Sequence, residues 1–335
     1  IAQCLVGSEM CIRDRYISMQ DGKSQQERWE EAAAACNDFI TTLGNKYPMD
    51  EYRLIRDYQN GEIIFDRRYG STNTFEKNNY PVGYNLGQSG NTPSQNLVDA
   101  YEMIDGTPFD WNNPEHKSNP YANRDPRLAM SILTNNVEFK DRTIEAWTGG
   151  RDGKGVIHAT RTGYYIYKFI DPNLDLLQNR TSVHHWVIMR YAEILLSYAE
   201  AMNEAYGPTG NVGYRLNAVR ALNQVRNRVG VEMPAVPTAI SKEELREKIR
   251  NERRVELAFE DHRFWDVRRW MIAEQEGVMS GAMYGIKIYW INSSPQEFRY
   301  TPYLYENRTF TKKMYLHPFS TNEVNKGYLI QNPGY

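Results

Sequence analysis

The residues that could most readily do chemistry lie in one stretch, Ile249–Trp270, with the sequence IRNERRVELAFEDHRFWDVRRW. It holds six arginines, five carboxylates and one histidine among Val, Leu, Phe and Trp. Glu256 and Glu260 are four residues apart, the spacing that places two side chains on one face of a helix. Asp261 directly precedes His262, and either pair could serve as an acid and a base. The other two interpretations are a nucleic-acid surface and a set of structural ion pairs.

Arginines accompany these carboxylates at helical spacing, which disfavours catalysis. A neighbouring guanidinium keeps a carboxylate ionised, whereas a general acid must hold its proton. Six arginines against five acids leave a charge of only +1, which also disfavours a nucleic-acid surface. The pairs three residues apart are Arg253 with Glu256, Glu260 with Arg263, and Asp266 with Arg269.

We therefore predict a buried helix whose charges are structural ion pairs, with no catalytic residue. Apolar side chains occur on nearly all of its sides, and a buried charge must be paired. Arginine forks suit carboxylates on neighbouring helices, where Glu193, Glu200 and Glu204 are the candidate partners. The predicted ion-pair residues are Arg253, Arg254, Glu256, Glu260, Arg263, Asp266 and Arg269.

Apolar periodicity indicates the helices that must position this stretch. Ser241 and Glu244 have the spacing of a capping box, which predicts one helix from there to about Glu274. Apolar stripes over residues 186–207 and 215–230, joined by the turn at 207–210, predict a helical hairpin of tetratricopeptide size. A further helix is predicted over residues 25–43, ended by Gly44.

The rest of the chain is predicted to be mostly loops with a few short strands. Residues 61–70 and 162–170 are β-prone, 51–58 and 95–103 predict short helices, and 123–133 fits a strand or a short helix. Residues 71–121 are rich in Asn, Gly, Ser, Pro and Tyr, and their aromatics argue against disorder. Residues 277–335 are predicted to be irregular and aromatic-rich.

The loops of 71–121 hold the predicted ligand site. A sugar ring has an apolar face, which suits a flat aromatic, and hydroxyls, which suit amides or charged forks. The alternative is that the aromatics only pin the loops to the helices. A second aromatic set could extend the surface: Tyr284, Tyr289, Trp290, Tyr300, Tyr303 and Tyr305. The predicted ligand-binding residues are Trp111, Tyr80, Tyr84, Asn78, Asn85, Asn112 and Arg68.

Composition excludes several classes of protein. The chain has 335 residues, a formal net charge of −2, and 24 Tyr and 7 Trp against 11 Phe. Near-neutral charge argues against general nucleic-acid binding, and there is no apolar run of about 18 residues. The three cysteines show no metal or redox spacing, and His184 and His185 point oppositely if extended, so we predict no metal site from these residues and no cofactor. A calcium site made of loop carbonyls and Asp stays open.

The first 15 residues, IAQCLVGSEMCIRDR, resemble a translated sequencing-adapter read-through. They contain Cys4 and Cys11, and we exclude them from the fold prediction. The native N-terminus is then expected to be missing, and residues 16–335 are expected to form one N-terminally truncated domain.

Six segments, in order, resemble the SusD/RagB family of outer-membrane nutrient-binding lipoproteins. They are LVDAYEMIDG, NRDPRL, MRYAEILLSYAEAMNEA, LNQVRNRVGV, the charged stretch 249–270 and the terminal HPFSTNEVNKGYLIQNPGY. The resemblance implies a mainly α fold, with tetratricopeptide-like hairpins supporting long irregular loops and a few short strands. It implies non-catalytic capture of oligosaccharides, or of another nutrient, for a SusC-like TonB-dependent outer-membrane transporter.

The same resemblance implies a surface-exposed protein at the cell outer membrane, lipid-anchored through a Cys in the missing N-terminal region. Two alternatives stay open from the residues alone. One is an intracellular helical-repeat scaffold that binds other proteins, and the other is a glycoside hydrolase, which needs two carboxylates in a cleft.

Overall fold

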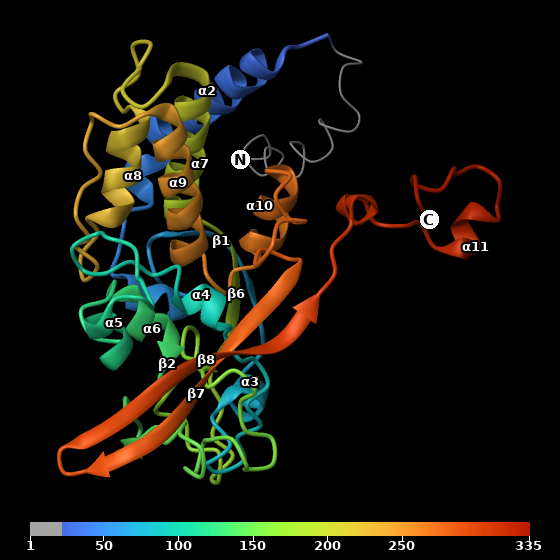
Figure 1. Cartoon of the computed structure of the whole chain (residues 1–335). Helices are drawn as coiled ribbons and strands as arrows, with labels where there is room; N and C mark the ends of the chain where they lie inside the picture. The colour runs from blue at the N-terminus through green and yellow to red at the C-terminus, as the bar shows by residue number, and fades with distance from the viewer. Residues whose placement is uncertain (1–21) are drawn as a thin grey trace.

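The computed structural model describes residues 22–335, so the excluded segment 1–15 lies outside the described residues. Helices form one end of the molecule, and a long β-hairpin with its loops crosses the other end (Figure 1). The C-terminal segment with α11 (Thr321–Val324) extends away from this body (Figure 1). None of the helices in the described part of the chain is long and apolar enough to span a membrane.

Four helices form the helical end, and α7 lies at its centre. They are α2 (Gln25–Leu43), α7 (Tyr191–Tyr206), α8 (Ala218–Arg226) and α9 (Lys242–Glu256). α7 packs against the other three and buries most of its residues, including Leu195, Leu196 and Met202. The predicted hairpin of α7 with α8 and the predicted helix over 25–43 are therefore confirmed. Val229, at the end of the predicted apolar stripe of residues 215–230, is instead 63% exposed because α8 ends at Arg226.

A two-stranded antiparallel sheet runs directly into this helical end. Strand β6 (His185–Arg190) pairs with β1 (Ile63–Arg68), with Ile63 opposite Arg190. Residues 186–190 were predicted to belong to the helix, and that prediction is wrong because their backbone pairs with β1. α7 begins at the next residue, Tyr191, so Arg190 lies where the sheet meets the helices.

The charged stretch forms two helices rather than one. Ser241 caps α9 through the predicted box with Glu244, but α9 ends at Glu256 and α10 covers His262–Arg269. Phe259 and Asp261 between them have φ of 64°, a left-handed conformation that a continuous helix does not contain. The prediction of one helix to Glu274 is therefore wrong.

Short elements connect these layers. The helices among them are α3 (Thr74–Asn79), α4 (Gln95–Val98), α5 (Pro114–Ser118), α6 (Arg127–Ser131) and the 3₁₀ helices η1 (Gly44–Lys46), η2 (Tyr52–Arg56) and η3 (Lys312–Tyr315). The two-residue strands pair antiparallel as β2 (Ile132–Leu133) with β5 (Tyr165–Ile166), and β3 (Glu138–Phe139) with β4 (Arg142–Thr143). The molecule is thus mainly helical with short strands, as the sequence predicted.

One pair of strands is long, an antiparallel hairpin near the C-terminus. Its strands are β7 (Gly281–Ser293) and β8 (Gln296–Arg308), in the part of the chain predicted to be irregular. Ile286 and Ile288 on β7 are buried together with Tyr300 on β8. That prediction is wrong for residues 281–308, because alternate side chains of the hairpin pack on the body.

Candidate functional site

Glu256 lies at the centre of a buried network of charges. Its carboxylate accepts hydrogen bonds from Arg190 at 2.7 Å and from Arg127 at 2.8 Å, and it also accepts one from Arg228. Glu62, which precedes β1, pairs with Arg190 at 2.7 Å and with Arg228. The Arg190, Arg228, Glu62 and Glu256 side chains are all 0% exposed. Because these residues come from distant segments, the network joins the β1–β6 sheet to three helical regions.

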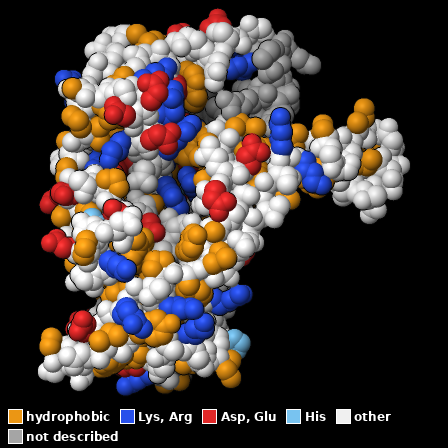
Figure 2. Space-filling view, in the orientation of Figure 1, with side chains coloured by type: hydrophobic (Ala, Val, Ile, Leu, Met, Phe, Trp, Pro, Cys, Tyr) orange, Lys and Arg blue, Asp and Glu red, His pale blue; other side chains and the backbone are white. Residues whose placement is uncertain are grey.

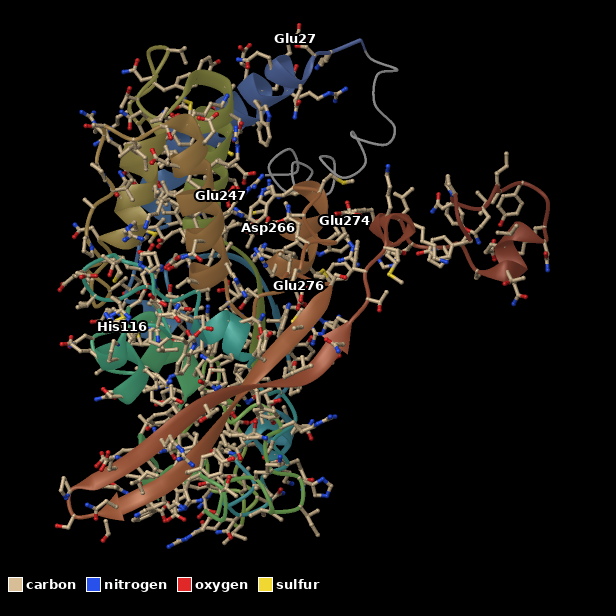
Figure 3. All side chains as sticks on the ribbon, viewed as in Figure 1. Glu27, His116, Glu247, Asp266, Glu274 and Glu276 are labelled. Carbon is tan, nitrogen blue, oxygen red and sulfur yellow. The ribbon has the colours of Figure 1, made fainter. Side chains whose placement is uncertain are left out.

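Further pairs extend the network on both sides. Glu260 pairs with Arg190 and Lys168, and Glu252 pairs with Arg127 and Arg226. Asp266 on α10 accepts from Arg253 on α9 at 2.9 Å, and Figure 3 shows Asp266 between these two helices. These bonds fix α10 against α9 although the chain between them is not helical.

The network keeps its carboxylates ionised. Burial alone would raise the pKa of Glu260, but Arg190 and Lys168 outweigh burial and lower that pKa to about 2. Burial opposes ionisation of Glu256 in the same way, and its three arginines lower its pKa well below the ordinary value. A carboxylate with so low a pKa is a poor general acid at neutral pH. The geometry therefore gives this cluster a structural role.

Several predicted partners differ from those in the structure. Asp266 pairs with Arg269 as predicted, but Arg253 pairs with Asp266 instead of Glu256. Glu260 lies beyond the end of α9 and pairs with Arg190 and Lys168, because the helix break turns it away from the predicted i+3 geometry.

Arg254 and Arg263 have other contacts than the predicted carboxylates. Arg254 donates to the backbone carbonyl of Asn96 at 2.6 Å, and Arg263 lies 6.0 Å from the centre of the Trp270 ring. Burial, with Arg254 nearby, lowers the pKa of Arg263 to about 9. The three glutamates predicted as partners on α7 are used differently: Glu200 pairs with Arg269, Glu204 with Arg246, and Glu193 lies 3.7 Å from His262.

Two residues of the predicted ligand site belong to the core. Tyr80 is 1% exposed, and its hydroxyl donates to the carbonyl of Asp171 at 2.5 Å. Tyr84 is 8% exposed, and its hydroxyl donates to the carbonyl of Phe139 at 2.7 Å. Their rings have no free face for a sugar, so the prediction that they bind ligand is corrected: they pin their loops to the body.

The other predicted residues do not form one surface. Trp111 is half-buried, and its indole N–H donates to Asp99 at 3.1 Å, while Asn112 beside it is exposed. Asn78, in α3, and Asn85, which follows it, are exposed, and α3 lies on the opposite side of the β7–β8 hairpin from α5 (Figure 1). Arg68 is exposed at the end of β1 and lies 5.0 Å from the centre of the Tyr58 ring.

A group of aromatic rings occupies the far end of the β7–β8 hairpin. We call Trp147, Trp290 and Phe298 the aromatic platform. Trp147 lies 4.7 Å from Trp290 and 5.3 Å from Phe298, measured between ring centres. Trp290 is 43% exposed and its strand neighbour Ile291 is 51% exposed. Trp290 was predicted only as part of a second aromatic set, and Trp147 was not predicted at all.

A hollow lies next to the aromatic platform, between β7 and the loop of residues 146–163. We call it the cationic hollow, because its charged side chains are Lys154, Arg161 and Lys287. Ile286, Ile288, Thr148 and Tyr303 line it as well. The ammonium nitrogens of Lys287 and Lys154 lie 4.8 and 5.5 Å from the centre of the Tyr303 ring.

Backbone contacts hold the loop against β7. The amide of Thr148 donates to the carbonyl of Ile288, and the amide of Ile286 donates to the carbonyl of Thr162, both at 2.8 Å. Gly285 permits this approach, since a Cβ there would lie 2.9 Å from the Cα of Thr162. Tyr303, the cross-strand partner of Gly285, donates its hydroxyl to the carbonyl of Arg161. The walls of the hollow are therefore fixed by the fold.

The adjacent histidines His184 and His185 contact different carboxylates. His184 contacts Glu76 at 2.9 Å, and His185 contacts Asp66 at 3.1 Å. Within residues 22–335, no group of three or more His, Cys, Asp or Glu side chains is arranged to hold a metal ion.

Known proteins resemble this chain in sequence and in structure. The sequence model of the SusD family matches residues 61–335. "SusD-like protein P2" of Formosa agariphila is 35% identical over 111 residues, which make up 32% of this chain and 20% of that protein.

Two solved structures from Bacteroides fragilis share the fold. A SusD-like protein has a TM-score of 0.74 and 29% identity, covering 99% of this chain and 64% of that one. A protein described as SusD-like and carbohydrate-binding has a TM-score of 0.73 and 27% identity, covering 90% of this chain and 61% of that one. This chain thus spans less than two thirds of the length of these relatives.

Proposed function

The chain belongs to the SusD family, and from that premise we propose that it binds oligosaccharides at the cell surface through the aromatic platform. The bound glycan then passes to a SusC-like TonB-dependent transporter in the outer membrane. A lipid anchor holds the protein at that membrane. A similar solved structure is described as carbohydrate-binding, which supports the ligand class.

The exposure of Trp290 is the observation that carries this proposal. A Trp that is 43% exposed leaves a large apolar ring in water, and the C–H face of a sugar would cover it favourably. Trp147 and Phe298 pack against Trp290 and hold its ring in place, so little conformational freedom is lost on binding. Trp111 with Asn112 stays a second proposed contact, although the indole N–H of Trp111 already has a partner in Asp99.

The carboxylates of the buried network are unsuited to catalysis. Glycoside hydrolysis requires one carboxyl group that holds a proton at working pH. The carboxylates of the buried network are paired with arginines or Lys168, which lower the pKa values of Glu256 and Glu260.

A binding screen with single substitutions tests the proposal. The purified chain is screened against oligosaccharides, and Trp290→Ala is expected to weaken binding of the best ligand about tenfold through loss of stacking. Tyr328→Ala is the matched control, because Tyr328 is 63% exposed but lies on the C-terminal segment. Trp111→Ala is measured alongside to weigh the second contact.

The outcomes separate the function from the site. If a ligand binds and Trp290→Ala leaves its affinity unchanged, the aromatic platform is not the site. If no oligosaccharide binds, glycan capture itself is wrong.

A further inference from the structure

Unlike the arginines of the buried network, the three cations of the cationic hollow form no ion pair with any described residue. Among residues 22–335, none of its three cations has a carboxylate within the 4.0 Å of an ion pair. Arg161 acts on Glu306 only at longer range: Glu306 pairs with Arg308 at 3.2 Å, and Arg308, with a smaller effect of Arg161, lowers the pKa of Glu306. Figure 2 shows Lys and Arg side chains gathered over the lower part of the molecule, which β7 and β8 cross.

Lys154 and Lys287 are close enough to act on one bound group. Lys154 and Lys287 both approach the ring of Tyr303, so their ammonium nitrogens lie within about 10 Å of each other. Arg161 carries the carbonyl that the Tyr303 hydroxyl bonds. That separation is about one screening length at physiological salt, so an anion between the two ammonium groups would interact with both.

The hollow and the aromatic platform are built from neighbouring residues of the chain. Thr148 lines the hollow and follows Trp147 of the platform directly in the chain. Ile288 lines the hollow and precedes Trp290 by two residues on the same strand, a separation of about 7 Å. A sugar on Trp290 would therefore place its neighbouring residue, about one monosaccharide away, at the hollow.

We propose that the cationic hollow is a subsite for an anionic group of the glycan, either the carboxylate of a uronic acid or a sulfate ester. The inference rests on the proposed glycan-binding function and narrows its ligand to acidic oligosaccharides. Lys154, Arg161 and Lys287 supply positive charge and hydrogen-bond donors for the anion. Neutral sugars lack the charge that would compensate three unpaired cations, so they gain less from this hollow.

Paired probes test the subsite. Binding of the full chain is measured by calorimetry to an oligogalacturonate and to the same oligosaccharide with its carboxyls reduced. A sulfated galactan oligosaccharide and its desulfated form make the second arm, and whichever pair shows the difference identifies the anion. Lys287→Gln and Lys154→Gln are each expected to weaken binding of the anionic probe about fivefold, without affecting its neutral form.

Arg299→Gln is the matched control. Arg299 is exposed on the same hairpin and lies 5.0 Å from the centre of the Tyr289 ring, outside the hollow. The Arg299→Gln substitution removes one positive charge from the hairpin, so it controls for general electrostatic attraction.

Three results overturn the inference in distinguishable ways. Equal affinity for an anionic probe and its neutral form in both arms, with Trp290→Ala still weakening binding, refutes the anionic subsite and leaves glycan binding intact. An equal loss in Arg299→Gln and Lys287→Gln refutes the hollow as the place where the anion binds. Failure of every oligosaccharide to bind refutes the proposed function and the subsite together.

Discussion

Replacing Glu256 with glutamine tests whether the buried network stabilises the fold. One carboxylate oxygen of Glu256 accepts hydrogen bonds from Arg190 and Arg228, and the other accepts one from Arg127. Glutamine keeps the shape but removes the charge and turns one acceptor into a donor, which then faces an arginine N–H. Removing one member of a buried ion pair costs about 3–5 kcal/mol, because the remaining charges stay buried without compensation.

The expected change in melting temperature follows from chain length. For 335 residues, the typical unfolding entropy per residue makes 1 kcal/mol correspond to roughly 1.4 °C. Glu256→Gln should therefore lower the midpoint by roughly 4–7 °C if the network and the helices unfold together. Differential scanning calorimetry, with near-UV circular dichroism to check that the native packing is retained, measures this directly.

Glu247→Gln is the matched control on the same helix. Glu247 pairs with Arg250 at 2.8 Å, but its side chain is 69% exposed, and such surface pairs contribute at most about 1 kcal/mol. Figure 3 shows Glu247 on α9, the helix that Glu256 ends. If the midpoints of the two variants differ by less than about 1 °C, the network is not a major source of stability and the reasoning fails.

Two further predictions concern pH and the hairpin. Because the pKa of Glu260 falls from 4.5 to about 2 on folding, its contribution is fully present above about pH 4.5 and is lost as pH falls toward 2. The melting temperature should drop across that window, and by less in Glu260→Gln; an equal drop in both proteins would contradict this assignment. Gly285→Ala places a Cβ 2.9 Å from Thr162 and should displace the loop, destabilise the fold by about 1–3 kcal/mol and weaken glycan binding. Unchanged calorimetric stability and affinity in that variant would show that the loop adjusts freely.

Local signals in the sequence predicted where α9 begins. The box of Ser241 with Glu244 begins α9 as expected, because both partners of that cap lie within one turn of each other. The end of α9 had no such signal, since no Gly or Pro occurs between Glu256 and His262. The helix breaks there while Glu260 pairs with Arg190, a contact between residues 70 positions apart. A local sequence pattern cannot predict a contact between residues so far apart in the chain.

The hairpin was missed although its pattern is present. Ile286 and Ile288 are buried on either side of Lys287, as a strand with one buried face requires, and the Ser294–Pro295 turn follows them. The burial of Tyr80 could not be foreseen in the same way. A tyrosine suits a ligand surface and a core equally well, and only the distant carbonyl of Asp171 decides between them.

The same residue types act oppositely in two parts of this molecule, and the difference lies in burial. Arg190 and Arg228 are 0% exposed, where an unpaired charge would cost several kcal/mol, so the fold must surround them with carboxylates. Lys154 and Arg161 are exposed, where an unpaired charge costs little and nothing compels a partner. Many charged residues among apolar ones, as in residues 249–270, therefore indicate buried structural ion pairs. A ligand can bind cations that have no ion-pair partner and lie beside exposed aromatic rings. In this molecule such cations lie at the β7–β8 hairpin.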